Sequence, residues 1–359
     1  MSERVVVAMS GGVDSSVTAA LLHEQGHEVI GITMKLWDGP ETVTASHKTC
    51  CTLDDVSDAR RVAAQLDIPF YVVNFKEQFS QHVIDYFVDS YRQGYTPNPC
   101  VQCNRYLKFT ALLQRAQQLG ASRVATGHYA SVLQGDDGRY YIQRGVDADK
   151  DQSYFLFDLT QAQLQQALLP LGELHKEHVR QIATRLKLRV AAKPESQEIC
   201  FIPDGDYRQF LRPRLTPETH QSGPMVNAAG EHLGAHQGLP FYTVGQRRGL
   251  GISAAQPLYV TAVEPTTNTL VVGQRHEAMC ETFEVERLNW MRSRPERAFT
   301  TTVQIRYRHH PVAAEVYPLS IERARITLHE PQFAVTPGHA AVFYDGQMVI
   351  GGGWIRRST

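Results

Sequence analysis

The sequence lacks any long apolar run. A helix needs roughly 18–20 consecutive apolar residues to span a bilayer, and no segment of the 359 residues approaches that length. Residues 1–5 lead directly into a short apolar segment, without the longer apolar core and small-residue cleavage site of a secretory signal. These absences argue against a membrane-spanning helix and predict a soluble, cytoplasmic protein with no membrane partner.

The chain also lacks a strong charge of either sign. It has 36 Lys and Arg against 37 Asp and Glu, with 42% hydrophobic and 20% charged residues. This mixture excludes a disordered, collagen-like or coiled-coil protein. The net charge of −1 excludes a broadly basic nucleic-acid coat, but it leaves room for a local basic patch. Lysine is absent after Lys193, and residues 281–359 hold ten arginines against eight acids.

Cysteine is scarce, with six residues at positions 50, 51, 100, 103, 200 and 280. Six are too few for a disulfide framework in a chain of this length. Cys100 and Cys103 form the one Cys-x-x-Cys pair, so a structural zinc site would lack its second half. Thiols of this kind are more often catalytic, metal-binding or simply buried, and Cys50, Cys51 and Cys280 suggest no role.

The apolar pattern predicts a parallel α/β domain first and β-rich domains later. Strands are expected at residues 5–9, 27–34, 69–75 and 123–126, alternating with helices at 16–25, 54–66, 78–92 and 104–119. Short strands at 258–263, 269–272, 301–307 and 340–344 are separated by Gly and Pro turns. We therefore predict three domains: an α/β domain at 1–204, a small central β-rich domain at 205–279 and a C-terminal β-barrel at 280–359.

A glycine-rich loop follows the first predicted strand and opens the first helix. It reads Ser-Gly-Gly-Val-Asp-Ser-Ser over residues 10–16. Two glycines allow close approach of the backbone to a ligand, and the hydroxyls and the helix N-terminus supply donors for phosphate oxygens. The Gly-Lys-Ser/Thr ending of a Walker loop is missing, so the pattern predicts a different pyrophosphate cradle, and an ordinary βα turn is the plain alternative.

The second chemical signal is the segment around Cys103. Pro97 and Pro99 enforce an extended approach, and a helix is expected to begin near Cys103 or Asn104. A helix N-terminus with Arg105 and Lys108 nearby would lower the pKa of the cysteine thiol and favour the reactive thiolate. Cys200 precedes an apolar patch, and its residues alone fit a buried inert cysteine as well as a functional one.

These motifs together resemble the bacterial tRNA-specific 2-thiouridylases, within the PP-loop ATP pyrophosphatases. The loop at 10–16 matches the SGGxDS signature, and the further matching segments follow in order at 98–109, 127–130, 150–154, 196–201, 245–250 and 351–353. The resemblance covers nearly the whole chain. It implies a PP-loop domain, a small central domain and a C-terminal barrel, in agreement with the boundaries above.

The resemblance implies 2-thiolation of the wobble uridine of tRNA. ATP would adenylate the uracil C2 oxygen, and a cysteine persulfide would then deliver sulfur, with release of AMP and pyrophosphate. Mg²⁺ would shield the polyphosphate charge, and no stable cofactor is expected. The implied partners are the tRNA anticodon arm and a persulfide-donating sulfur-relay protein, and a monomer is expected.

The resemblance also assigns residues. Cys103 matches the nucleophile, and Cys200 matches the persulfide carrier that forms a transient disulfide with it. The positions implied for ATP are Ala8, Met9, Ser10, Gly11, Gly12, Val13, Asp14, Ser15, Met34 and Gly127. The positions implied for the target base and tRNA are Asn98, Pro99, Cys100, His128, Lys150, Asp151, Gln152, Arg306, Tyr307 and His339. No protein metal site is implied.

Two positions depart from the family pattern, and alternatives stay open. Cys100 replaces the usual Asp, and His339 replaces the usual Gln. With Cys100, three thiols would be available to hold a [4Fe–4S] cluster, as an alternative route for sulfur. A PP-loop amide-forming ligase would need no cysteines, and a tRNA-binding module without activity would need no phosphate loop.

Overall fold

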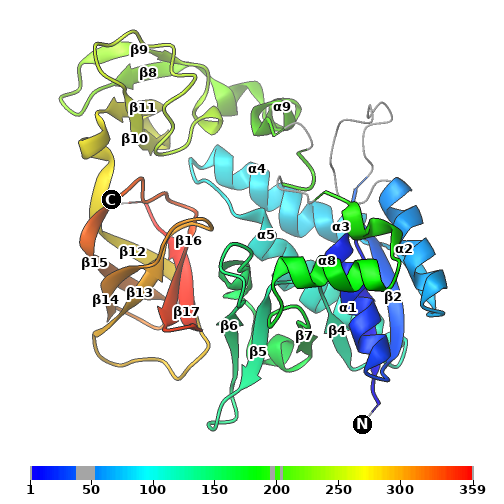
Figure 1. Ribbon diagram of the computed structural model, residues 1–359. Helices are drawn as coiled ribbons and strands as arrows, with labels where there is room; N and C mark the ends of the chain where they lie inside the picture. The colour runs from blue at the N-terminus through cyan, green and yellow to red at the C-terminus, as the bar shows by residue number, and fades with distance from the viewer. Residues whose placement is uncertain (1, 38–52, 195–198, 203–204, 358–359) are drawn as a thin grey trace. The chain divides into compact units, whose positions relative to one another are not determined.

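The computed structural model describes residues 2–37, 53–194, 199–202 and 205–357 (Figure 1). The chain divides into two compact units that interleave along the sequence. Unit 1 comprises Met1–Val83, Pro99–Gly205 and Gln347–Ile350, and unit 2 comprises Ile84–Asn98, Asp206–Gly346 and Gly351–Thr359. Across the described ranges, no helix has the combination of length and apolar character that a bilayer crossing demands.

Unit 1 is built on a five-stranded parallel sheet in the order β3-β2-β1-β4-β7. The strands are β1 (Arg4–Ala8), β2 (Glu28–Lys35), β3 (Phe70–Asn74), β4 (Arg123–Ala125) and β7 (Ala167–Leu168). Val5, Val6 and Val7 are fully buried, as expected for a central strand covered on both faces. The predicted parallel sheet is confirmed, and its first four strands lie within one or two residues of their predicted positions.

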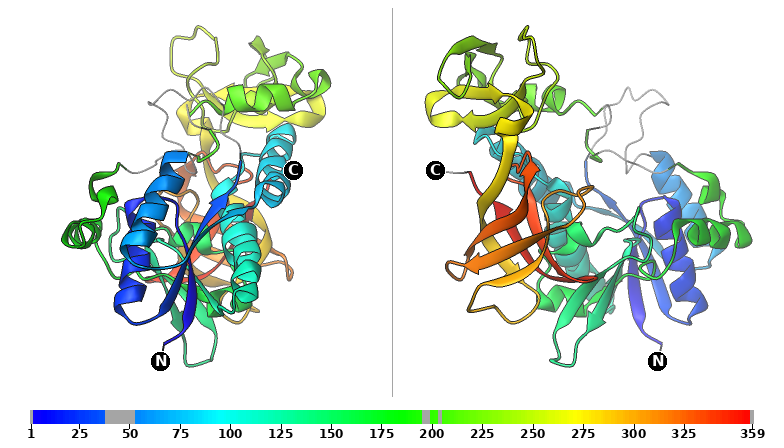
Figure 2. Two further views of the ribbon diagram at one scale, coloured as in Figure 1. Left: turned by 90° about the vertical axis from the view of Figure 1, so that its right-hand side faces the viewer. Right: turned by 60° about the vertical axis from the view of Figure 1, so that its left-hand side comes forward.

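Helices cover both faces of this sheet (Figure 2, left). One face packs against α1 (Val13–Glu24) and α2 (Leu53–Gln65), which share an apolar core with β1 and β2, and α8 (Lys176–Arg185) packs on α1 and joins the same core. On the other face, α6 (Leu112–Gln118) contacts β1 and β4. It continues α5 (Pro99–Gln102) and a π-helical segment, η2 (Cys103–Ala111). The predicted helix at 104–119 therefore begins earlier and contains a π-helical stretch.

A hairpin extends unit 1. Strands β5 (Ala130–Gln134) and β6 (Tyr140–Arg144) pair antiparallel, and β6 also pairs with Met348 and Val349 at the start of β17 (Met348–Ile355). The sequence did not predict this hairpin. The remaining helical segments of unit 1 are α3 (Lys76–Phe79), the π-helical η1 (Ser80–Ile84), η3 (Ser153–Leu156), α7 (Gln161–Gln165) and η4 (Arg189–Ala192).

Unit 2 contains two β structures. A four-stranded sheet has the order β10-β11-β8-β9, formed by β8 (Gly223–Val226), β9 (His232–His236), β10 (Tyr259–Glu264) and β11 (Thr269–Gly273). A six-stranded barrel runs β12-β15-β14-β13-β16-β17 and closes through pairing of β12 with β17. Its other strands are β12 (Met279–Trp290), β13 (Phe299–Gln304), β14 (Val312–Pro318), β15 (Arg323–Phe333) and β16 (Ala340–Asp345). The predicted barrel is confirmed.

Unit 2 also contains helices and short 3₁₀ turns. They are α4 (Asp85–Arg92), α9 (Tyr207–Leu211) and the short 3₁₀ turns η5 (Arg212–Arg214), η6 (Pro217–His220), η7 (Leu239–Phe241), η8 (Pro265–Thr267) and η9 (Arg275–Ala278). Tyr91 of α4 stacks on Tyr207 of α9 with ring centroids 4.8 Å apart. The single helix predicted at 78–92 is thus α3, a π-helical turn and α4, and the last of these packs with the later part of the chain.

Candidate active site

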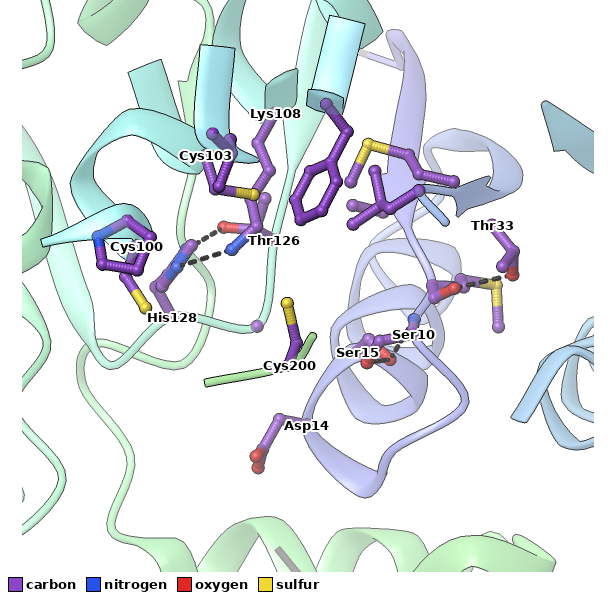
Figure 3. A pocket seen from close by; sticks show the side chains of 18 of the residues that line it. Ser10, Asp14, Ser15, Thr33, Cys100, Cys103, Lys108, Thr126, His128 and Cys200 are labelled. Atoms are coloured by element: carbon purple, nitrogen blue, oxygen red, sulfur yellow. Dashed lines mark hydrogen bonds between the residues drawn. The ribbon is translucent and has the colours of Figure 1, made fainter. Parts of the chain in front are cut away.

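A pocket of about 320 Å³ lies in unit 1 at the C-terminal ends of β1, β2 and β4 (Figure 3). This is the position where parallel α/β sheets bind ligands. We call it the unit-1 pocket. Its described lining is Ala8, Met9, Ser10, Asp14, Ser15, Ile32, Thr33, Met34, Leu36, Phe79, Val83, Pro99, Cys100, Cys103, Lys108, Thr126, Gly127, His128, Gln152, Ile199, Cys200 and Phe201.

The glycine-rich loop forms one wall of this pocket. The Ser10 backbone N–H donates to Ser15 Oγ at 3.1 Å, which closes the loop onto the first turn of α1. Gly11 has φ +76°, and a Cβ there would lie 2.2 Å from the backbone oxygen of Asp55. Only glycine fits this approach. The loop therefore presents Ser10 and Ser15 and the N-terminus of the twelve-residue α1, a suitable environment for phosphate oxygens.

Asp14 is held by two partners. Its carboxylate accepts hydrogen bonds from Lys176 Nζ at 2.7 and 2.8 Å and from the Tyr129 hydroxyl at 2.7 Å. Among the described residues that line the pocket, Asp14 is the one carboxylate, and Lys176 compensates its charge. Mg²⁺ prefers carboxylate ligands together with substrate phosphates. Asp14 is the described carboxylate that would hold a phosphate-bound Mg²⁺, and the ion would shield the polyphosphate charge there.

Three thiols line the same pocket. Cys100 is exposed, whereas Cys103 and Cys200 are half-buried. Pro99 occupies the first position of α5, which proline favours, so the helix starts before Cys103 and places Cys100, not Cys103, in its first turn. The predicted helix start at Cys103 or Asn104 is therefore wrong. Within the described ranges, no three His, Cys, Asp or Glu side chains are grouped to bind a metal.

The two basic residues after Cys103 differ in their surroundings. Arg105 pairs with the buried carboxylate of Asp158 at 2.6 Å, so its charge is compensated away from the pocket. Lys108 lines the pocket, and its ammonium donates to Asn104 Oδ1 at 2.9 Å and contacts His128 Nε2 at 3.3 Å. Of the two residues predicted to favour a thiolate, Lys108 alone faces the pocket in the described structure.

His128 is a buried neutral ring. Burial first, and then the charge of Lys108, hold its pKa well below the usual value. Because an ammonium group can only donate, Nε2 must accept from Lys108. Nδ1 then carries the proton and donates to the Thr126 hydroxyl at 2.6 Å. His128, implied as a tRNA contact, therefore lies inside the pocket in contact with Lys108.

The structure brings many of the predicted site residues together. The unit-1 pocket contains Ala8, Met9, Ser10, Asp14, Ser15, Met34, Pro99, Cys100, Cys103, Gly127, His128, Gln152 and Cys200. Gly11, Gly12 and Val13 belong to the loop but are not part of the described lining. Cys50 and Cys51 lie outside the described residues.

Lys150 and Asp151 are the remaining predicted residues of unit 1. They directly precede the pocket residue Gln152 in the sequence. The Asp151 side chain is 8% exposed and accepts from Arg144 Nη1 at 2.7 Å, from Gly145 N at 3.1 Å and from Ser153 N at 3.0 Å. This carboxylate orders the turn after the hairpin. Lys150, beside it, is half-buried.

The other predicted residues belong to unit 2. Asn98 ends the segment at 84–98, and Arg306, Tyr307 and His339 lie in the barrel part of the chain. Burial first, and then the charge of Arg306, lowers the pKa of His339 to about 4. Arg306 and Tyr307 follow the end of β13 at Gln304, so the predicted strand at 301–307 is shorter than expected.

Some lining residues were missed by the sequence reasoning. Ile32 and Thr33 line the pocket at the end of β2, and Thr33 Oγ1 donates to the Met9 carbonyl at 2.7 Å. Their position at the C-terminal end of a predicted parallel strand was the available signal. Phe79 and Phe201 lie edge to face at 5.7 Å and form an apolar wall. Because they come from distant segments, no local pattern pointed to this pair.

Three family models match the chain. They are described as "tRNA methyl transferase HUP domain" at residues 3–204, "tRNA methyl transferase PRC-barrel domain" at 208–274 and "Aminomethyltransferase beta-barrel domain" at 280–355. The first alone covers more than half of the sequence.

Curated relatives match almost the full length. A tRNA-specific 2-thiouridylase MnmA of Geotalea uraniireducens is 52% identical over 360 residues, covering 99% of this chain and 96% of the relative. One of Carboxydothermus hydrogenoformans is 50% identical, covering 99% and 98%. Among solved structures, an NMN synthetase from Francisella tularensis shares 20% identity with a TM-score of 0.33, over 54% of this chain and 66% of that one.

Proposed function

The chain belongs to the family of tRNA-specific 2-thiouridylases, and we propose that it carries out the family reaction in the unit-1 pocket. It is an ATP-using tRNA sulfurtransferase that converts the wobble uridine to 2-thiouridine. The observation that carries the location is that the phosphate loop, Cys103 and Cys200 line one pocket. A ligase without sulfur chemistry would not require the two thiols there.

The proposed reaction uses each part of the pocket. The loop at Ser10–Ser15 binds the ATP phosphates, and the uracil C2 oxygen attacks the α-phosphorus to form an adenylated base and pyrophosphate. Adenylation makes the oxygen a good leaving group. A persulfide on Cys200 then supplies sulfur to C2, either directly or as hydrosulfide released by Cys103. Both routes end with AMP, thiolated tRNA and a Cys103–Cys200 disulfide that needs reduction.

The reaction requires two macromolecular partners. Cys200 is loaded by a persulfide-donating protein, and the anticodon arm supplies the base, with Asn98, Pro99 and Cys100 beside it. Splaying a loop base out of its stack is the normal mode of single-stranded RNA recognition. Arg306, Tyr307 and His339 of unit 2 are proposed to contact tRNA. A cytoplasmic monomer is also part of this proposal.

One experiment tests the reaction. The enzyme is incubated with tRNA, ATP, Mg²⁺ and a sulfur donor, and the tRNA is digested and analysed by mass spectrometry. The expected result is one oxygen-to-sulfur exchange at the wobble position. Cys103→Ser and Cys200→Ser should each abolish it, while Cys280→Ser, a half-buried thiol of unit 2, should not. Full thiolation by either active-site variant would contradict the proposed sulfur route.

A second sulfur route is a [4Fe–4S] cluster held by Cys100, Cys103 and Cys200. The sharing of one pocket by these three thiols favours it, whereas their described arrangement does not form a metal ligand set. Anaerobic purification separates the routes. A colourless protein that is fully active with a persulfide donor excludes the cluster. Activity that follows the iron content and the visible absorption of a cluster would replace the persulfide route.

A further inference from the structure

Lys108 presents a positive charge to the unit-1 pocket that no carboxylate compensates within the described residues. Its ammonium group has three protons, and the described structure supplies two acceptors, Asn104 Oδ1 at 2.9 Å and His128 Nε2 at 3.3 Å. The other described lysines near this loop differ, because Lys176 is paired with Asp14 and Lys193 with Asp55 and Asp58. An uncompensated ammonium in a partly enclosed pocket favours an anionic ligand.

The position of this charge is fixed from both sides. Asn104 is buried, and its Nδ2 donates to the Phe155 carbonyl at 3.0 Å, which orients Oδ1 toward Lys108. His128 is buried and neutral, and its Nδ1–H is held by Thr126. Figure 3 shows the Lys108 ammonium and the Thr126 hydroxyl meeting the His128 ring on the side of the pocket that carries Cys103. Such a fixed donor stabilises charge without reorganising during the reaction.

Gly127 connects this cation to the phosphate loop. A Cβ on Gly127 would lie 2.9 Å from the backbone C of Asp14 and 2.9 Å from the backbone N of Ser15. The segment from Thr126 to His128, which includes the His128 ring in contact with Lys108, therefore packs directly on the start of α1. A nucleotide bound at this loop would offer its phosphates as the nearest anions. The α-phosphate becomes bonded to the base during adenylation, and the thiols must reach the same base. The α-phosphate must therefore lie between the loop and the thiols.

We propose that Lys108 is a catalytic residue that binds the non-bridging oxygens of the α-phosphoryl group during adenylation, with Asn104 and His128 as positioning residues. This inference rests on the proposed function. In the step concerned, the uracil O2–P bond forms, the bond between the α-phosphorus and the bridging oxygen breaks, and pyrophosphate leaves with the electron pair. The uracil N3 proton passes to solvent. Lys108 transfers no proton and contributes its charge alone.

The test measures tRNA-dependent pyrophosphate release in a single turnover without a sulfur donor. Lys108→Met is expected to slow release about 10²–10³-fold, the usual effect of removing one preorganised donor to a developing charge. Lys108→Arg should recover part of the rate. Lys187→Met, at an exposed lysine of the same unit, is the charge-matched control and should leave the rate unchanged.

A second readout separates contact from structure. In ATPαS one non-bridging α-oxygen is sulfur, and the rate ratio between ATP and ATPαS reports a contact to that oxygen. The ratio should move toward one in Lys108→Met. If that variant fails to fold, Lys108→Gln, which also lacks the charge, carries the test, and an unchanged ratio in it overturns the inference.

The outcomes distinguish this inference from the function on which it rests. A wild-type enzyme that releases no pyrophosphate with tRNA contradicts the proposed function and this inference together. An active wild type with Lys108→Met within twofold of it overturns the inference alone.

Discussion

Lys193 Nζ lies 2.9 Å from the carbonyl oxygen of Gly11, which joins the segment before Cys200 to the phosphate loop. The same ammonium donates to Asp55 Oδ1 and Asp58 Oδ2, each at 2.7 Å, in the first turns of α2. All three of its protons are used. Because a peptide unit is planar and trans, fixing the Gly11 carbonyl also fixes the direction of the Gly12 N–H. One side chain thus orders the loop and anchors the chain that carries Cys200.

Lys193→Met is expected to weaken ATP binding about tenfold and to lower the free energy of unfolding by about 1–2 kcal/mol. The loop loses its orientation, and the buried Asp55 and the half-buried Asp58 lose their partner, although the partial exposure of Lys193 and Asp58 limits the cost. Calorimetric titration with ATP and urea denaturation measure the two effects. Lys187→Met is the control, and equal ATP affinity in both variants would show that the loop does not depend on Lys193.

Asp14→Asn should destabilise unit 1 by about 2–3 kcal/mol. It removes the charge that compensates Lys176, whose side chain is only 10% exposed, and a buried ammonium without a partner is costly. Urea denaturation at neutral pH measures the loss. Asp149→Asn, at an exposed acid of the same unit, should change stability little. Equal stability of the two variants would mean that water compensates Lys176.

Much of unit 1 was predictable because its signals are local. The apolar run at 5–9, the glycine-rich loop and the acids that open α2 each act over a few residues, and their strands and helices are confirmed. The position of the loop was predictable as well, because a turn between a buried strand and a helix must lie at the end of a parallel sheet. The sequence also predicted that the C-terminal part of the chain forms a β-barrel.

Long-range features were not predictable in the same way. The pairing of β6 with residues 348 and 349 joins segments about two hundred positions apart, and neither segment alone indicates a partner. The role of Lys108 depends on His128 being neutral, which burial decides. The early start of α5 at Pro99 was a local signal that was missed, because the proline was interpreted as a break and not as a first helical residue.

Asp151→Asn is expected to lower the stability of unit 1 by about 2 kcal/mol. The carboxylate accepts from Arg144 and from two backbone N–H groups, and an amide satisfies these donors poorly. Urea denaturation measures this loss. Lys150→Met is the contrasting variant: if Lys150 contacts a tRNA phosphate, its loss should reduce the salt dependence of tRNA binding by about one ion with little change in stability. Unchanged salt dependence in Lys150→Met would rule out a phosphate contact by Lys150.

His339→Gln should make unit 2 less sensitive to acid. Burial, and then the charge of Arg306, lower the pKa of His339 from 6.5 to about 4. In the unfolded chain the ring binds a proton below pH 6.5, whereas the folded protein keeps it neutral until about pH 4. Stability is therefore lost as the pH falls through this window, by at most about 1.4 kcal/mol per pH unit for one such group. The glutamine variant cannot take up that proton.

The measurement is the free energy of unfolding between pH 7 and 4, monitored by a probe in the barrel such as Trp290 or Trp354 fluorescence. The slope of stability against pH should be smaller in His339→Gln than in the wild type. His276→Gln, at an exposed histidine of unit 2, should keep the wild-type slope. The Nδ1 atom of His339 is buried, and no hydrogen-bond partner for it lies within the described residues, so protonation there would leave a buried charge unsolvated. Parallel slopes for all three proteins would mean that the folded ring takes up its proton near the ordinary pKa, and that Arg306 does not hold it neutral.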